Sequence, residues 1–218
     1  MLLTIPFERY VSSLGDTVTM VGVSAVLACA AGIPLAVLLI VTAPGGFWES
    51  PRVNRVAAAV VNGFRATPFI VLLVALLPFT RIVAGTTIGV WAAIVPMTIS
   101  ATPFFARIAE VSLREVDPGL IEAAQAMGCR KWHIVRHVLL PEALPGIVGG
   151  FTVMLVTLIG ASAMAGAVGA GGLGDLAIRY GYQRFDTQVM VIVIAALIVL
   201  VTLVQFAGDF YVRRLKNR

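Results

Sequence analysis

Two histidines have a spacing that metal sites use. His133 and His137 are four residues apart, which would place both imidazole rings on one face of a helix, where they could bind a metal ion. No cysteine, aspartate or glutamate nearby completes a convincing metal site, and arginines flank the pair. We therefore expect both histidines to be surface residues and predict no metal site.

Glycine gathers in the stretch 166–174, which could suggest a loop that binds phosphate. A P-loop requires G-x-x-x-x-G-K-[ST], and no lysine follows these glycines. Gly172-Leu173-Gly174-Asp175 also matches the G-x-G-D pattern of intramembrane aspartyl proteases, whose chemistry needs two carboxylates close together. The nearest candidate for a second carboxylate, Asp186, lies in the same predicted outer loop, so we expect Asp175 to be an exposed loop residue. No catalytic residue is predicted, and the chain is not expected to be an enzyme.

The composition indicates a chain that is exposed mostly to lipid. Of its 218 residues, 59% are hydrophobic and 12% charged, with a mean hydropathy of +0.97. A soluble domain carries about 25% charged residues. The net charge of +5 does not predict nucleic-acid binding, because the basic residues lie between apolar runs and form no patch with aromatic residues.

Five apolar segments are long enough to cross a membrane, which takes about 20 residues per helix. They run over residues 17–43, 56–80, 82–106, 143–174 and 187–208, and only the second contains a charge, Arg65. Twelve of the sixteen lysines and arginines fall on one side of this arrangement. Because cytoplasmic loops are enriched in lysine and arginine, the N-terminus is predicted outside and the C-terminus in the cytoplasm.

Prolines and glycines accumulate inside these segments. Such residues disturb helices that line a polar cavity, although they are also common in membrane helices generally. A charge inside the membrane suggests function, but the long stem of Arg65 could carry its guanidinium to the cytoplasmic interface, and we favour this interpretation because the apolar run begins just after Arg65. Arg65, Thr67 and Ser162 are the candidates for lining a transport pathway.

A short helix is predicted in the long cytoplasmic segment at about 107–145. Asp117 is a good N-cap, Pro118 suits the first helical position, and Gly128 suits the position just past the end. The helix is slim because it contains three alanines. It could dock into the groove of a partner or lie on the bilayer surface, and physical arguments alone leave both readings open.

Glu122-Ala123-Ala124, followed by Gly128 and then by Val138, Leu140 and Pro141, resembles the cytoplasmic EAA signature of binding-protein-dependent ABC importer permeases. Valine at 138 instead of isoleucine is a mild departure. In that family the segment is the coupling helix that docks into the ATPase subunit. The resemblance therefore implies coupling roles for a set of residues within this signature: Asp117, Glu122, Ala123, Ala124, Gly128, Leu140 and Pro141.

Other stretches are similar to the methionine-uptake branch of this family: 70–81, 138–146, 166–174, 180–182 and 205–209. The resemblance implies an all-α, five-span permease of the type I ABC importer fold, formed by one domain over 1–218 in a bacterial inner membrane. It implies a second copy of the chain, two cytoplasmic ATPase subunits that bind ATP and Mg²⁺, and an extracytoplasmic methionine-binding protein. The alternative substrate is another amino acid or a small zwitterion. The alternative of another class is a self-sufficient secondary transporter, which would need more ionisable residues inside its spans.

Overall fold

The computed structural model describes residues 5–216, and every regular element within that range is a helix. In chain order the elements are α1 (Phe7–Thr42), α2 (Pro51–Ala66), α3 (Phe69–Ala75), α4 (Leu77–Ala84), α5 (Val90–Arg114), α6 (Pro118–Ala126), α7 (Lys131–Ile134), the π-helical turn η1 (Val135–Leu139), α8 (Leu140–Ala167), α9 (Gly172–Leu176), the π-helical turn η2 (Ala177–Tyr182) and α10 (Thr187–Lys216).

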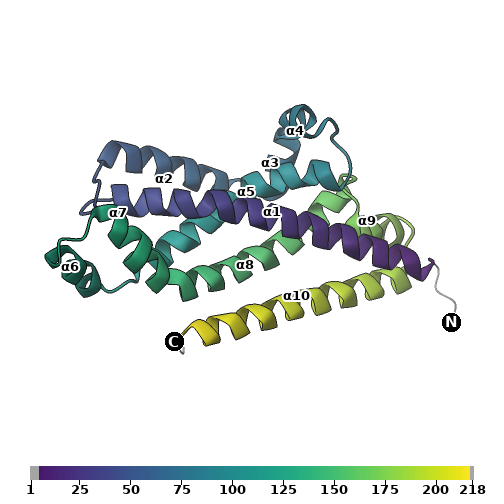
Figure 1. Cartoon of the computed structure of the whole chain (residues 1–218). Helices are drawn as coiled ribbons and strands as arrows, with labels where there is room; N and C mark the ends of the chain where they lie inside the picture. The colour runs from purple at the N-terminus through teal and green to yellow at the C-terminus, as the bar shows by residue number, and fades with distance from the viewer. Residues whose placement is uncertain (1–4, 217–218) are drawn as a thin grey trace.

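Helices α1, α5 and α8 form the centre of an elongated bundle (Figure 1). Their shared core contains the fully buried side chains of Met20, Met97, Phe105 and Met154. At the crossing of α1 and α5, a methyl group added to Gly32 would lie 2.9 Å from a ring carbon of Phe105. A glycine is therefore needed here for the two helices to pack this closely.

Four helical stretches are long and apolar enough to cross a membrane: α1, α5, the continuous stretch Lys131–Ala167, and α10. Helices α2 and α3 are long and apolar enough only when taken together, and they meet at an angle of 104°, so the pair is either a fifth, broken span or a re-entrant loop. Five crossings were predicted, but the second was expected as one helix over 56–80, and that expectation is wrong. The break occurs at Thr67, because the residue before a proline is disfavoured in the helical conformation.

The third crossing also begins later than predicted. After α3, the short helix α4 ends at Gly85, and a turn leads to Gly89, where α5 begins. Both glycines have positive φ, 73° and 95°, which other residues adopt only with strain. Charge-free sequence thus continues from 82 to 106, but the helix that crosses starts at Val90.

The cytoplasmic segment predicted at about 107–145 contains more helix than its sequence suggested. Helix α5 continues to Arg114, and this extension buries Glu110, whose residue is only 1% exposed. Its carboxylate accepts hydrogen bonds from Arg107 at 2.8 Å and from Arg114 at 2.7 Å. The two guanidinium groups offset the desolvation of this carboxylate.

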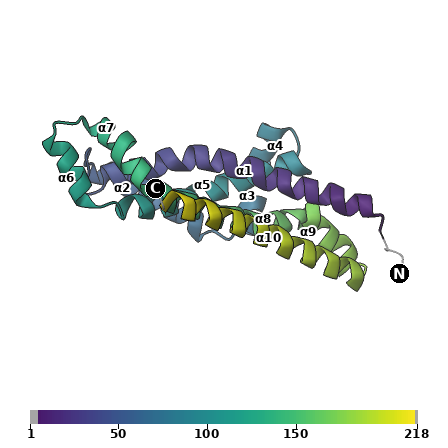
Figure 2. The same cartoon turned by 60° about the horizontal axis from the view of Figure 1, so that its bottom comes forward.

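The two ends of the bundle differ in content. One end holds α6, α7, the connection between α1 and α2, and the end of α10, and the other holds the start of α1, α9 and η2 (Figures 1 and 2). Several basic residues that were predicted to be cytoplasmic therefore lie toward the α6 end: Arg52, Arg55, Arg130, Lys131, Arg136, Arg213, Arg214 and Lys216. Arg218, which was counted with them, lies outside the described residues. The orientation in the membrane stays a prediction from these charges.

At the opposite end, each carboxylate of the protease hypothesis has a partner. Asp175 lies in α9, half-buried rather than exposed in a loop, and accepts a hydrogen bond from Arg179 at 2.6 Å. Asp186 accepts a hydrogen bond from the backbone N–H of Val189 at 3.1 Å. The two carboxylates are thus engaged separately, and this arrangement does not support a shared-proton pair.

Candidate functional site

Helix α6 has the capping that its sequence predicts. The side chain of Asp117 accepts a hydrogen bond from the backbone N–H of Gly119 at 2.8 Å, and Pro118 occupies the first helical position. At the other end, Gly128 has a φ of +76°, and its N–H donates to the carbonyl oxygen of Gln125 at 2.9 Å. The predicted helix, from Pro118 to about Met127, is confirmed to within one residue.

Only part of α6 packs against the rest of the chain. Ala124 is buried, whereas Glu122 and Ala123 are exposed. Two large apolar side chains also remain exposed: Leu120 at 43% and Met127 at 76%. A helix that leaves such side chains uncovered is suited to packing against a partner.

The connection between α1 and α2 supports the segment that carries α6. Nζ of Lys131, at the start of α7, donates a hydrogen bond to the backbone oxygen of Phe47 at 2.6 Å. The same ammonium lies 5.9 Å from the centre of the Trp48 ring, within range of a cation–π interaction. One side chain therefore ties the region after α6 to the connection that leads into α2.

The later residues of the signature lie at the start of α8. Leu140 is half-buried and Pro141 exposed, and Pro141 lines an open groove together with Asp117. The structure thus brings two distant parts of the signature to one surface at the α6 end. His133 and His137 lie close to this end, with their rings stacked 4.3 Å apart. Residues 5–216 contain no group of three or more residues able to hold a metal ion.

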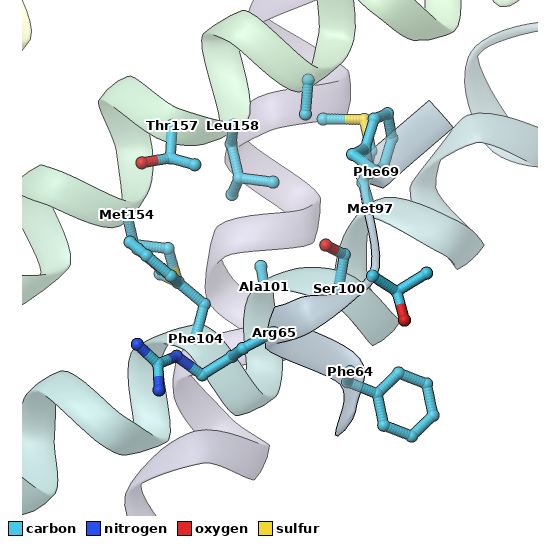
Figure 3. Close-up of a pocket in the computed structure, with 12 residues that line it drawn as sticks. Phe64, Arg65, Phe69, Met97, Ser100, Ala101, Phe104, Met154, Thr157 and Leu158 are labelled. Carbon is cyan, nitrogen blue, oxygen red and sulfur yellow. The ribbon is translucent and has the colours of Figure 1, made fainter. Parts of the chain in front are cut away.

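A second candidate site is a cavity of 180 Å³ between the α2–α3 break, α5 and α8 (Figure 3). Met97, Phe104 and Met154 line it with apolar surface, and hydroxyl groups come from Ser100 and Thr157. The remaining lining residues are Phe64, Arg65, Thr67, Phe69, Ala101, Leu158 and Ala161. Its residues on α5 and α8 come from the middle of those helices, and the cavity opens to the outside of the chain, because Phe64, Arg65 and Thr157 in its lining are exposed.

Arg65 lies near the C-terminal end of α2, about 21 Å along the helix axis from Pro51. In Figure 3 its guanidinium extends toward Phe104 and Met154, whereas the ring of Phe64 points the other way. Arg65 lines the cavity and is itself exposed. Its role in a transport pathway stays a prediction. Thr67 also lines the cavity, and its hydroxyl donates to the backbone oxygen of Gly63 at 3.0 Å.

Ser162, the third residue predicted for the pathway, is not among the lining residues. It is buried in α8, and its hydroxyl donates to the backbone oxygen of Ile159 at 2.7 Å. Sequence reasoning missed the methionines, aromatic residues and hydroxyls of the cavity, because nothing in the linear sequence separates them from ordinary residues of membrane helices. The proline after Thr67 was the one available signal that a break, and hence a cavity, could form there.

Long apolar helices, a broken helix pair and a capped, largely exposed short helix at one end are features that a transport permease combines. The chain belongs to the family of inner membrane components of binding-protein-dependent transport systems, whose model matches residues 32–217. It is a multi-pass membrane protein with the type I ABC importer permease fold.

Relatives and solved structures agree with this assignment. The chain is 52% identical over 203 residues to a probable D-methionine transport system permease protein of Vibrio cholerae, covering 93% of this chain and 90% of that protein. It is 42% identical to a methionine import system permease protein of Bacillus subtilis, covering 83% and 82%. A solved inward-facing structure of a methionine ABC transporter matches with a TM-score of 0.96 and 48% identity, covering 98% of this chain and 99% of that one.

Proposed function

We propose that this chain is the membrane-spanning subunit of an ATP-driven importer of methionine. The observation that carries this proposal is α6, which is capped at both ends and exposes Glu122, Leu120 and Met127 at one end of the bundle. The relatives named for methionine transport support the substrate. The chain itself breaks no bond of the substrate and binds no nucleotide, and ATP and Mg²⁺ belong to the partner ATPase subunits.

The working assembly contains two copies of this chain, two ATPase subunits and an extracytoplasmic methionine-binding protein. A homodimer is expected because one copy leaves most of α10 uncovered. Two-fold symmetric dimers are the commonest assemblies of identical chains. Its pathway runs along the two-fold axis and past the cavity that Arg65 and Thr67 line. Asp117, Glu122, Ala123, Ala124, Gly128, Leu140 and Pro141 form or position the docking surface for the ATPase.

ATP binding closes the ATPase pair and moves the two α6 helices toward each other. This motion reaches the cavity by two routes within the chain. Helix α7 continues through η1 into α8, which forms one wall of the cavity. Lys131 connects the same region to the α1–α2 connection, and α2 carries Arg65 at its far end. The crossings then change from inward-open to outward-open in an alternating-access cycle.

Uptake of labelled methionine tests this function. Cells that lack this chain and any redundant methionine carrier would receive either the wild type or Glu122→Lys. We expect uptake with the wild type alone, because the reversed charge prevents α6 from docking. Methionine uptake that the wild type does not restore would contradict the substrate, and other amino acids would then be screened.

A further inference from the structure

Two arginines stand at the start of α2 without an acidic partner. Arg52 and Arg55 are three residues apart, so they share one side of the helix, and both are exposed. Within residues 5–216, every ion pair involves other arginines. Between residues 44 and 66 the only carboxylate is Glu49, which accepts a hydrogen bond from the backbone N–H of Gly45 at 3.1 Å. The start of α2 is thus a positively charged surface that no ion pair within the described residues neutralises.

This surface is held firmly against the end of α1. The side-chain amide of Asn54 donates a hydrogen bond to the backbone oxygen of Leu39 at 2.7 Å. The backbone N–H of Trp48 donates to the carbonyl oxygen of Val41 at 2.9 Å. The Trp48 ring lies 5.9 Å from Nζ of Lys131. A ligand at the start of α2 therefore meets a preformed surface with an indole ring at its side.

The length of α1 places this surface at the edge of the membrane. The apolar run 17–43 extends about 40 Å as a helix, compared with about 30 Å for the hydrocarbon core. The connection that follows, residues 44–50, therefore lies at the level of the lipid headgroups or just beyond it. Trp48 in this connection is 45% exposed, and tryptophan and basic residues are the side chains that favour this level. Under the proposed function this end of the bundle, which carries α6, faces the cytoplasm (Figure 1).

An apolar stripe continues from this surface along α2. Four exposed apolar side chains follow one another at spacings of three or four residues and so share one side of the helix: Val53, Val56, Val60 and Phe64. The stripe extends about 16 Å along the helix axis. Because α2 returns alongside α1, the stripe runs from the charged end toward the middle of the bundle (Figure 1).

An anionic phospholipid combines the two chemistries that this surface offers. A guanidinium presents a planar fork of donors that matches a phosphate. The apolar stripe, which leads from the headgroup level into the hydrocarbon, matches an acyl chain. A soluble partner such as the ATPase could cover the arginines, but it could not follow the stripe to Phe64, about 20 Å along α2 from Pro51.

We propose that α2 binds one anionic phospholipid of the cytoplasmic leaflet, with its phosphate on Arg52 and Arg55 and an acyl chain along the stripe from Val53 to Phe64. Trp48 stands beside the phosphate at the headgroup level. The site goes beyond the proposed function, and only the choice of leaflet rests on that function. A lipid bound here stabilises the end of α2 that lies next to the α1–α2 connection.

Native mass spectrometry of the complex with its ATPase subunits, purified in detergent, tests the site. The complex is titrated with dioleoyl phosphatidylglycerol or with dioleoyl phosphatidylcholine, which has the same chains but no net charge. We expect the first phosphatidylglycerol on each copy of the chain to bind about tenfold or more tightly than phosphatidylcholine, because each arginine near the membrane surface attracts an anionic lipid by several-fold. Arg52→Gln combined with Arg55→Gln should remove this preference. An excess of glycerol phosphate, which has no acyl chains, should not displace the lipid.

The matched control is Arg213→Gln combined with Arg214→Gln, which removes two exposed arginines from α10 at the same end of the bundle and should keep the preference. Val56→Thr combined with Val60→Thr keeps the shape of the stripe but makes it polar. Both lipids should then bind more weakly by a similar factor, with the preference unchanged.

Several outcomes would overturn the proposal. One is equal binding of the two lipids by the wild type, and another is a preference that survives the Arg52 and Arg55 variant or disappears equally in the α10 control. Displacement by glycerol phosphate would reduce the site to one for a phosphate ion. Loss of the ATPase subunits from the Arg52 and Arg55 variant would assign the surface to the ATPase, and dissociation of the two copies by the valine variant would assign the stripe to the second copy.

A second measurement locates the lipid on the unaltered chain. Phosphatidylglycerol with a photoreactive diazirine on one acyl chain is added to the complex in phosphatidylcholine nanodiscs, and tryptic peptides are analysed after irradiation. Cleavage after Arg55 and Arg65 releases 56–65, which carries most of the stripe. Unlabelled phosphatidylglycerol in excess should abolish crosslinks to this peptide, and phosphatidylcholine should not. Crosslinks on other peptides alone would contradict the site. Neither measurement involves methionine, so their failure would leave the importer function standing.

Discussion

The coupling segment and the membrane cavity are built in opposite ways. Helix α6 and its caps come from twelve consecutive residues, Asp117 to Gly128, and each cap is a contact between near neighbours in sequence. The cavity takes its lining residues from separate helices, between Phe64 and Ala161. A change in α6 should therefore disturb one interface with a partner, whereas a change in the cavity should affect the substrate and leave the partner bound. Single substitutions in the two regions separate these outcomes.

The largest effect is expected from Glu122→Lys. It reverses a charge on the exposed face of α6, where a partner would pack, and like charges at such a contact cost several kcal/mol. Both methionine uptake and recovery of the ATPase subunits on purification should fall by more than about tenfold. Glu8→Lys makes the same charge change on an exposed residue at the opposite end of the bundle and should leave both unchanged. Full ATPase recovery with Glu122→Lys would remove Glu122 from the docking surface.

A smaller loss is expected from Gly128→Val, which places a β-branched residue at a φ of +76°. The strain of this left-handed conformation is about 1–2 kcal/mol, and a Cβ there would meet no other atom within 4 Å, so the effect is conformational and not steric. Uptake should fall several-fold. Gly128→Asn, a residue that tolerates this conformation, should retain most of it. If the two variants transport equally, the turn at Gly128 does not limit coupling.

Lys131→Met removes the tie between the coupling segment and the α1–α2 connection without touching α6. The ATPase should still be recovered in full, but more ATP should be hydrolysed for each methionine transported, by about two- to fivefold, since one charge-assisted hydrogen bond and one cation–π contact are lost. Arg130→Met, at the neighbouring exposed position, is the control. An unchanged ratio of ATP hydrolysed to methionine transported would show that α8 alone transmits the motion.

The smallest effect is expected from Ser162→Ala. The hydroxyl of Ser162 already donates to its own helix and does not face the cavity, so uptake should stay within about twofold of the wild type. The measurement is methionine uptake by Ser162→Ala and by the wild type over a range of methionine concentrations. A large rise in the methionine concentration needed for half-maximal uptake would restore Ser162 to the pathway.

The sequence predicts the coupling segment better than the cavity for a physical reason. Caps such as Asp117 and Gly128 act on the backbone within three or four residues, so local sequence is sufficient to place α6. The break after α2 had a local signal in Thr67-Pro68, but the apolar run continues through it, and counting hydropathy merged α2 with α3. Where a helix continues beyond the apolar segment, its residues are no longer uniformly apolar, so hydropathy does not mark the continuation. The extension of α5 to Arg114 and the burial of Glu110 were missed for this reason.

Met97, Phe104, Met154 and Thr157 could not have been chosen from the sequence. Each is an ordinary residue of a membrane helix, and the helices form a cavity only because α2 breaks beside α5 and α8. Arg65 was recognised because a lone charge in an apolar segment is conspicuous. Its position beside the middle of α5 and α8 depended on the packing of those helices.

The most direct test compares Glu122→Lys and Arg65→Gln in one experiment that measures both ATPase recovery and methionine uptake. We predict that Glu122→Lys loses both, and that Arg65→Gln keeps the ATPase subunits and loses uptake. If Arg65→Gln also lost the ATPase subunits, or if Glu122→Lys kept them, the separation between a docking helix and a substrate cavity would be contradicted.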